Sequence, residues 1–221
     1  VVIVVHDITR EKEIDRMKSE FISTVSHELR TPLAITKEGI SLILDLIPGP
    51  INEQQQKILT KASDNIDRLS RIINNLLDIS KIEAGRVELK KEFVDIAELA
   101  RSVLGAFESR FKAKGLDISF EADSGGVWIC VDADKMVQVF TNLLNNALKF
   151  TNQGSVSVKI RHAHDTVECM ISDTGIGISE EDIPRVFQKF QQFGRTPGAG
   201  DKGTGLGLSI VKGIVELHKG K

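Results

Sequence analysis

The 221-residue sequence lacks several features that would assign it to a protein class at once. It has only two cysteines, Cys130 and Cys169, which are too few for a disulfide framework or a four-cysteine zinc site. Purely apolar runs reach only about five residues, as at Val1–Val5, whereas a membrane span needs about 20. No signal peptide is visible. Lys and Arg (29) do not outnumber Asp and Glu (31), so the basic field of a general nucleic-acid binder is absent and we expect no nucleic-acid partner.

What is present favours a globular protein. Hydrophobic residues make up 41% and charged residues 27% of the chain, a balance that excludes wholesale disorder. The apolar start at Val1–Val5 looks like a strand without a partner, and the end at 215–221 stops just after a helix-like run. We therefore interpret the chain as part of a longer protein. We expect this part to be cytoplasmic and leave a membrane anchor of the full-length protein open.

The first 83 residues predict two long helices. One runs from about Thr9 to Leu46, and the other from about Glu53 to Glu83, with a Pro-Gly-Pro break between them. Each helix is apolar over more than one stripe, so a single hairpin would leave apolar surface uncovered. The prediction is a dimeric four-helix bundle, and the alternative is a hairpin packed against another domain. The apolar positions that define the helix period are Ile14, Met17, Phe21, Val25, Leu29, Ala62, Ile66, Leu69, Ile73 and Leu76.

The residues after about 85 alternate between strand and helix patterns and predict an α+β domain. Asp95 followed by Glu98 resembles a capping box, which would start a helix that ends near Ala113. A second helix is expected at about 134–149, and a third at about 207–218. Short strands are expected at 116–122, 127–133, 155–163 and 166–173, the last two as an antiparallel pair. We expect one sheet with helices on one face, and expect Trp128 and both cysteines to face the core.

The segment Ser26–Leu33 in the first helix carries one chemical candidate. A neutral imidazole such as that of His27 is a nucleophile near pH 7, and a neighbouring carboxylate such as that of Glu28 can take its proton. Thr31 lies one helical turn from His27, whereas Glu28 points about 100° away from it. Pro32 should kink the helix beside this cluster. Spacing alone leaves open a solvated, inactive His27, and it assigns no role to His6, His162, His164 or His218.

A second candidate is spread over the α+β part. Asn142 and Asn146 share a helix face, with Lys149 three residues further on; amide oxygens suit Mg²⁺ and a lysine suits phosphate. Asp173 precedes a glycine-permitted turn and could accept a hydrogen bond from an exocyclic amine. The glycine-rich run 203–207 leads into a helix, whose N-terminal amides favour an anion. Each pattern is weak alone, and their order on one unit strengthens them.

From about Arg16 to its end, the chain resembles the catalytic core of the sensor histidine kinases of two-component systems. FISTVSHELRTPL resembles the phosphoacceptor box, VFTNLLNNALKFT the asparagine box, and DTGIGI the first glycine box. VFQKFQQF and GTGLGLSI resemble the phenylalanine box and the second glycine box. The resemblance implies a helical hairpin that forms a dimeric four-helix bundle, followed by an α+β sandwich domain of the Bergerat type.

The resemblance also implies a reaction. ATP would phosphorylate His27, and the phosphoryl group would pass to an aspartate in the receiver domain of a response regulator. Glu28 would be the general base, and Thr31 would position water when the protein acts as a phosphatase on its regulator.

The same resemblance implies a nucleotide site for ATP and Mg²⁺. Asn146 would ligate Mg²⁺, Asn142 and Lys149 would lie near the phosphates, and Asp173 would bind the adenine amine. Lys189 would reach the γ-phosphate. Phe187 and Phe190 would either anchor the lid over the nucleotide or belong to the core. The lid and phosphate loop would comprise Gly175, Gly177, Gly203, Thr204, Gly205, Leu206 and Gly207.

The expected domain organisation follows from these assignments. Residues 1–15 would end an upstream sensor domain, of the PAS type, and its signalling helix. Residues 16–83 would form the dimerising phosphotransfer hairpin, 84–88 a linker, and 89–221 the ATP-binding domain, cut short at its C-terminus. The segment 82–87, with Gly85 inside it, would be the hinge between the two functional parts.

Two other classes compete with this interpretation. A Bergerat-type ATPase similar to the gyrase B subunit would need a carboxylate in the asparagine-box helix to activate water, and residues 139–149 contain no Asp or Glu. A degenerate scaffold would have no use for intact glycine boxes. We therefore expect a protein-histidine kinase.

Overall fold

The computed structural model describes residues 9–193 and 203–221, and these residues form two compact units that meet between Val87 and Glu88. The strand expected at Val1–Val5 and the residue His6 lie outside the described residues. Within the described ranges, no helix combines the length and the apolar character needed to cross a bilayer.

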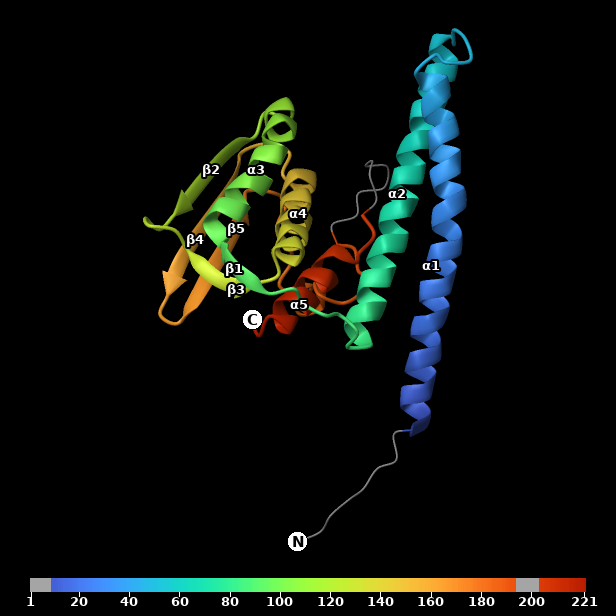
Figure 1. Ribbon diagram of the computed structural model, residues 1–221. Helices are drawn as coiled ribbons and strands as arrows, with labels where there is room; N and C mark the ends of the chain where they lie inside the picture. Colours follow the sequence, from blue (N-terminus) through green and yellow to red (C-terminus); the bar gives the residue numbers. More distant parts are fainter. Residues whose placement is uncertain (1–8, 194–202) are drawn as a thin grey trace. The chain divides into compact units, whose positions relative to one another are not determined.

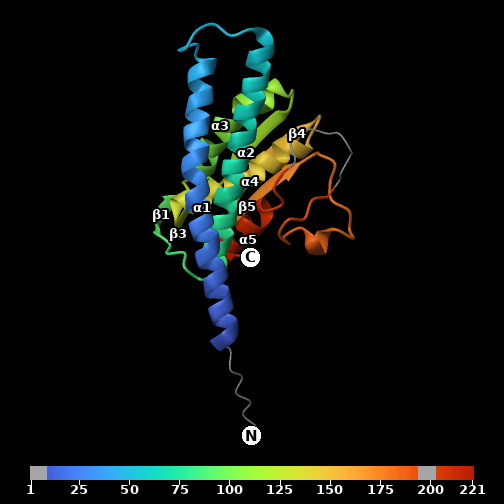
Figure 2. The ribbon, with the colours of Figure 1, turned by 90° about the vertical axis from the view of Figure 1, so that its right-hand side faces the viewer.

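The first unit is a hairpin of two long helices that lie side by side (Figures 1 and 2). Helix α1 spans Thr9–Leu44 and α2 spans Glu53–Glu83, so both predicted helices are confirmed, the first ending two residues earlier than expected. The helix α1 continues through Pro32, whose carbonyl accepts a 2.7 Å hydrogen bond from Thr36 Oγ1. A proline that removes one backbone bond therefore does not end this helix.

The ends of α2 are defined by local hydrogen bonds. The Asn52 side chain accepts from the Gln55 N–H (2.8 Å) and the Gln55 side chain accepts from the Asn52 N–H (2.9 Å), a capping box that the sequence analysis missed. At the other end Gly85 has φ 62°, and the Arg86 N–H donates to the Lys81 carbonyl (2.9 Å). Glycine adopts this left-handed conformation without a steric cost and so terminates α2 before residue 86.

The hairpin buries only part of its apolar surface. Ile73 and Ile79 are buried between the helices. Most of the apolar residues that define the period of α1 are exposed in the single chain, among them Phe21, which is 69% exposed. The other large apolar residues exposed on the two helices are Ile14, Met17, Val25, Leu29, Ile35, Leu42, Ile58 and Leu69. Stripes of this length on a monomer indicate a surface that another element covers.

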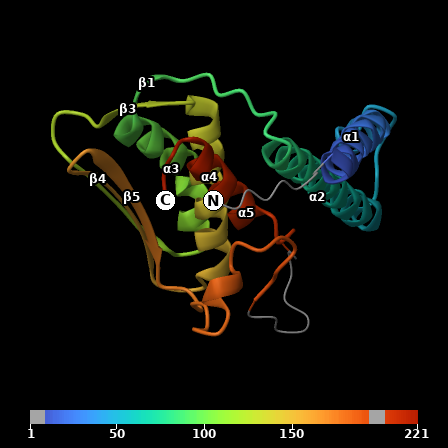
Figure 3. The same cartoon turned by 90° about the horizontal axis from the view of Figure 1, so that it is seen from below.

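The second unit has strands and helices in the order β1-α3-β2-β3-α4-β4-β5-α5, with a 3₁₀ turn at Ile183–Arg185 before α5. The bounds are β1 Glu92–Asp95, α3 Ile96–Ala113, β2 Asp117–Ala122, β3 Trp128–Val131, α4 Ala133–Phe150, β4 Ser155–Ala163, β5 Thr166–Asp173 and α5 Gly207–Leu217. Figure 3 shows α3, α4 and α5 on one side of the β4–β5 sheet.

The strands form two sheets rather than the single sheet expected. One contains β1 and β3, antiparallel, and the other has the order β2-β4-β5. The antiparallel pairing of β4 with β5 is confirmed, whereas β2 runs parallel to β4, with Ile118 opposite Val156. This parallel pairing joins segments separated by α4, which is why local sequence patterns did not reveal it.

The core of this unit lies between the three-stranded sheet and the helices. On β4, Val156, Val158 and Ile160 are buried, while Lys159 and Arg161 between and beyond them are exposed. The helices contribute fully buried side chains to the same layer, including Ile96, Phe111, Leu144, Ile210 and Ile214. Every second residue of the strand is buried, and so is one face of each helix. This burial is typical of a domain in which a layer of helices packs on a sheet.

Asp95 caps α3, as predicted. Its carboxylate accepts from the N–H groups of Ala97 (3.0 Å) and Glu98 (3.4 Å), and also from Val127 (3.1 Å) before β3. The bond from Val127, followed by those within the cap, holds the pKa of Asp95 below its ordinary value. One side chain therefore starts α3 and positions the turn that precedes β3.

The expectation that Trp128, Cys130 and Cys169 face the core is wrong for Trp128 and Cys130. Cys169 lies on the core-facing side of β5, opposite the buried Ile160, but is exposed there. Trp128 is 60% exposed, and both cysteines are exposed. Cys130 lies opposite the exposed Phe93 on the outer face of the β1–β3 pair. Alternation divides a strand into two faces, but it does not tell which face another layer covers, and a separate two-stranded sheet leaves one face open.

Candidate functional site

His27 lies on the surface of α1, beside a residue that packs inward. Ser26 is buried in the hairpin (2% exposed), and His27 is exposed one residue further along the helix. One turn on, Arg30 of α1 donates from Nη2 to Asn74 Oδ1 of α2 (3.0 Å) and so links the two helices. The local packing thus orients the His27 side chain toward solvent, where a second molecule or domain could reach it.

Glu28 and Thr31, the predicted neighbours of His27, are also exposed. Both side chains belong to the same turn of α1, with Thr31 four residues after His27 and so on its face. Among the described residues, no hydrogen bond or ion pair joins Glu28 to His27. All three side chains are therefore exposed on one stretch of α1, with Thr31 on the His27 face and Glu28 turned away from it.

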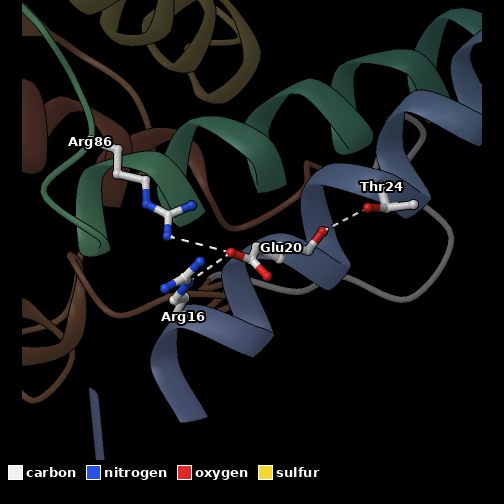
Figure 4. Close-up of polar contacts among 4 residues, drawn as sticks. All are labelled: Arg16, Glu20, Thr24 and Arg86. Carbon is white, nitrogen blue, oxygen red and sulfur yellow. Dashed lines mark hydrogen bonds and ion pairs between the residues drawn. The ribbon is translucent and has the colours of Figure 1, made fainter. Parts of the chain in front are cut away.

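A charged cluster ties the end of α2 to α1 about two turns before His27 (Figure 4). The Glu20 carboxylate accepts from Arg16 Nε (2.9 Å) and lies 4.0 Å from Arg86 Nη2. The Glu20 carbonyl accepts from Thr24 Oγ1 (3.0 Å). Hydrogen bonding and charge from Arg16 lower the pKa of Glu20, and Glu20 raises the pKa of Arg16. Since Arg86 belongs to the predicted hinge, this cluster attaches the hinge to α1.

In the second unit, α4 carries the predicted polar residues. Its buried face includes Phe140, Leu144 and Leu148, and Asn142 and Asn146 are half-buried at its margin. Lys149, near the end of the helix, lies 4.7 Å from the Phe150 ring centroid through its Nζ. An amphipathic helix thus presents two amide side chains and one cation along a partly covered edge.

The glycine-rich segment before α5 runs directly past these side chains. A methyl group added at Gly203 would lie 2.8 Å from Lys149 Nζ, and one added at Gly207 would lie 3.5 Å from Asn142 Oδ1. The backbone N–H groups at the start of α5 therefore lie beside an amide and a cation, in the arrangement that favours binding of a phosphate group. Leu206, in the same segment, is fully buried and anchors it.

Asp173, at the end of β5, lies near the C-terminal end of α4. Its carboxylate accepts from the Gly175 N–H (2.9 Å) and from Thr151 Oγ1 (3.4 Å). A methyl group at Gly175 would lie 2.6 Å from the Phe150 carbonyl oxygen and 2.7 Å from Asp173 Oδ1. Glycine is thus required for the close approach of this turn to α4, and the turn leaves Asp173 exposed.

The predicted phenylalanine box approaches the same glycine segment. The Phe190 N–H donates to the Gly205 carbonyl (2.9 Å), and Gln192 Nε2 donates to the Gly203 carbonyl (2.6 Å). Lys189 therefore precedes a residue bonded to the glycine segment. Phe187 (47% exposed) and Phe190 (64% exposed) do not belong to the core, which removes one of the two roles left open for them. Gln192 was not identified from the sequence.

Among the described histidines that the sequence left without a role, His218 is the exception. His162 and His164 are exposed, as a solvated role requires. His218 is half-buried, and both ring nitrogens have partners, the Asp132 N–H and the Ile214 carbonyl. A single histidine after a helix gives no sequence signal for such contacts.

The donor set fits a nucleoside triphosphate and its metal ion. The residues provide a carboxylate acceptor at Asp173 and a cation at Lys149. They also provide glycines, such as Gly203 and Gly205, where an added side chain would collide with neighbouring atoms. Among the described residues, no group of three or more His, Cys, Asp or Glu could hold a metal ion. A divalent ion here would therefore take its oxygens from the amides of α4 and from the nucleotide's own phosphates, the usual arrangement for Mg²⁺.

Comparison with protein families matches the two units separately. Residues 17–85 match the His Kinase A (phospho-acceptor) domain. Residues 131–221 match the family described as histidine kinase-, DNA gyrase B- and HSP90-like ATPase.

Curated relatives include proteins named as histidine kinases or sensor proteins. The chain is 38% identical over 215 residues to hybrid signal transduction histidine kinase D of Dictyostelium discoideum, covering 95% of this chain and 14% of that protein. It is 35% identical over 224 residues to the sensor protein SrrB of Staphylococcus aureus, covering all of this chain and 38% of SrrB. The chain thus spans well under half the length of these relatives.

Solved structures agree with the fold. The full-length structure of ShkA in complex with AMPPNP is 29% identical, with a TM-score of 0.74, over 89% of this chain and 40% of ShkA. Histidine kinase ThkA in complex with response regulator protein TrrA superposes with a TM-score of 0.62 over 98% of this chain and 63% of that chain, at 23% identity. With both matched domains in the order found here, the chain belongs to the sensor histidine kinases and carries their phosphoacceptor domain and their ATP-binding domain.

Proposed function

We propose that this protein uses ATP to phosphorylate His27 and then transfers the phosphoryl group to an aspartate of a response regulator. The observation that carries this proposal is the convergence of Asn142 and Lys149 of α4 on the glycine segment of α5, in a unit separate from the exposed His27. One unit is thereby suited to hold the nucleotide, while the other offers the nucleophile.

In the nucleotide site, we assign Asp173 to the exocyclic amine of adenine, because its carboxylate is an exposed acceptor at the end of β5, beside Gly175. Asn146 would supply an oxygen to Mg²⁺, which would neutralise phosphate charge when bound. Asn142, Lys149 and Lys189 would lie along the phosphates. The lid and phosphate loop would be formed by Gly175, Gly177, Gly203, Thr204, Gly205, Leu206 and Gly207.

In the transfer step, a ring nitrogen of His27 attacks the γ-phosphorus. An N–P bond forms, the P–O bond to ADP breaks, and the imidazole proton passes to the Glu28 carboxylate. Glu28 is one residue from His27 and exposed, so it could turn toward the ring once the reacting group arrives. Thr31, on the His27 face, would position water for dephosphorylation of the regulator.

The hairpin would act as a homodimer through its exposed apolar stripe. The matched phosphoacceptor domain supports this assembly, as does the large exposed fraction of Phe21. The complex of ThkA with TrrA supports a receiver domain as the second partner. Residues 1–15 would connect to an upstream PAS-type sensor, 16–83 form the phosphotransfer hairpin, 84–88 the linker, and 89–221 the ATP-binding domain. This part of the protein would be cytoplasmic, and a membrane anchor elsewhere in the full-length protein is left open.

An ATPase of the gyrase type is the second candidate. It would need a carboxylate on α4 that faces the nucleotide, and residues 139–149 of α4 contain none. The histidine kinase assignment needs no such group, because His27 rather than water accepts the phosphoryl group.

The deciding experiment incubates the chain with Mg²⁺ and ATP radiolabelled in its γ-phosphate. We expect a label that is lost in acid and retained in base, absent from His27→Ala and unchanged in His162→Ala, a control on the exposed surface of β4. Label in His27→Ala, or release of free phosphate without protein labelling, would contradict the proposal.

A further inference from the structure

The start of α4 and the end of α5 are joined by the His218 ring. The Asp132 N–H, just before α4, donates to His218 Nε2 (3.0 Å), and His218 Nδ1 lies 2.8 Å from the Ile214 carbonyl oxygen. A backbone N–H can only donate and a carbonyl can only accept. Both contacts are therefore satisfied together only by the neutral ring with its proton on Nδ1.

The Asp132 end of this link is firmly held. Its carboxylate is buried (6% exposed) and accepts from the N–H groups of Lys90 (2.9 Å) and Lys135 (3.1 Å). Although burial alone would raise the pKa of Asp132, these bonds from Lys90 and Lys135 and the charge of Lys135 keep that pKa below its ordinary value. The anchor therefore ties together the first turn of α4 and the segment that enters β1.

The His218 end is fixed at the cost of backbone strain. The chain turns sharply after His218, with Lys219 at φ 64° and the Gly220 N–H bonded to the Val215 carbonyl (2.9 Å). A non-glycine residue in this conformation is unfavourable, and such strain is retained where the surrounding structure requires it. The turn holds the imidazole against Asp132.

The link acts on two helices that run in opposite senses. Asp132 and His218 meet at one end, and Asn142 and Gly207 meet at the other. From Asp132 to Asn142 the path along α4 is about 15 Å, and from Gly207 to His218 the path along α5 is about 16 Å, at 1.5 Å per residue. The two paths are nearly equal in length, so the helices are aligned at both contacts. Holding Asp132 and His218 together therefore limits how far Gly207 can slide along α4 past Asn142.

From this geometry we propose that His218 is a positioning residue for nucleotide binding. By holding the end of α5 against the start of α4, it fixes where the backbone amides of Gly203–Gly207 lie along α4, next to Asn142 and Lys149. Its effect should fall on the phosphate groups of the ligand, since Asp173 belongs to β5 and is not held by this link. This inference rests on the nucleotide site assigned above.

The test compares His218→Leu with His218→Gln and uses His162→Leu as the matched control. NMR titration measures the affinity of each folded variant for Mg·ADP and for adenosine. We expect His218→Leu to weaken Mg·ADP binding about tenfold, the size of one lost hydrogen bond, and to change adenosine binding less than about twofold. His218→Gln, whose side-chain oxygen can replace Nε2 as acceptor, should recover Mg·ADP binding to within about threefold. His162→Leu should bind both ligands like the wild type.

Three results would overturn the proposal. Unchanged Mg·ADP affinity in His218→Leu would show that α5 keeps its position without the ring. Equal losses of affinity for Mg·ADP and for adenosine in His218→Leu would show a general structural role. Failure of His218→Gln to recover Mg·ADP binding would show that the hydrogen-bond acceptor at this position does not determine the affinity.

One measurement does not depend on a variant that folds. Imidazole nitrogen shifts of the wild type should report the tautomer with its proton on Nδ1; a protonated Nε2 would contradict the link. Absence of any nucleotide binding by the wild type would instead count against the proposed function, so the two failures are distinguishable.

Discussion

The Arg86 guanidinium lies 4.0 Å from the Glu20 carboxylate and connects the segment that follows α2 with α1, about two helical turns before His27. A second pair, Lys18 with Glu83, also at 4.0 Å, spans the same end of the hairpin with the opposite polarity. Lys18 and Glu20 are two residues apart and so point to different sides of α1. Turning α1 about its axis would lengthen at least one of the two pairs, which links the orientation of α1 to the hinge.

Neutralising Glu20 or Arg86 should loosen the hinge turn. The Gly85 and Arg86 N–H groups bond to the Ile82 and Lys81 carbonyls, so their hydrogen exchange reports its stability. We expect Glu20→Gln and Arg86→Gln each to speed this exchange modestly, and the double variant to add little, because both remove one interaction. Exposed pairs are screened, so high salt should have the same effect on the wild type. Lys112→Gln, which breaks an ion pair on α3, is the control; additive effects would contradict the coupling.

Substituting Gly175 should weaken nucleotide binding through Asp173. An added methyl group would lie 2.6 Å from the Phe150 carbonyl oxygen and 2.7 Å from Asp173 Oδ1, so the turn must shift. We expect Gly175→Ala to lower ATP affinity by about tenfold or more, measured by titration, since a displaced carboxylate leaves an adenine hydrogen bond unmade. Gly105→Ala is the control, because nothing lies within 4 Å of its added methyl group on α3. It should stabilise the unit by about 0.5–1 kcal/mol and leave binding unchanged.

The Cys169 thiol should be unreactive despite the exposure of the residue. Cys169 lies opposite the buried Ile160, and burial, with a smaller contribution from Glu168, raises the pKa of its thiol to about 11 from 9.0. In a Cys130→Ser variant, alkylation at pH 8 should be about 100-fold slower than for a thiol of ordinary pKa, because the thiolate is the reactive form. The rate should keep rising up to about pH 11; a plateau near pH 9 would show that the thiol is solvated.

Removing the Asp95 carboxylate should destabilise the second unit in a pH-dependent way. Its pKa is lower in the folded state than the ordinary 3.8, chiefly through the bond from Val127. The stabilisation is therefore fully present above about pH 4 and is lost as the pH falls through the folded pKa. Urea midpoints of Asp95→Ala should fall below those of the wild type at pH 7 and approach them near pH 2. Asp95→Asn, which keeps an acceptor oxygen, should lie between the two, and a difference that persists at pH 2 would assign the effect to packing.

Local features of the sequence predicted most of the elements. The period of the apolar residues predicted α1 and α2, and Asp95 marked the start of α3, because caps and periodicity depend on neighbours within a few residues. The candidate site was predicted from the order of its motifs along the chain and from their resemblance to the sequence boxes of histidine kinases.

The arrangement of those elements could not be derived in the same way. Alternation in β3 predicted two faces but not which one is covered, so Trp128 was assigned to the wrong side. The parallel pairing of β2 with β4 and the contact of Lys149 with Gly203 join residues more than 30 positions apart, and no local pattern encodes such contacts.

By itself, the sequence determined where most helices and strands form, because short-range hydrogen bonding and hydrophobic period set those properties. Only the tertiary structure decided how α4 and α5 align. That alignment brings His218 into contact with Asp132, 86 residues away, which the sequence around His218 does not predict. The physical reason is that the free energy of such a contact depends on the packing of the whole unit, which brings both partners to one place before either can bond.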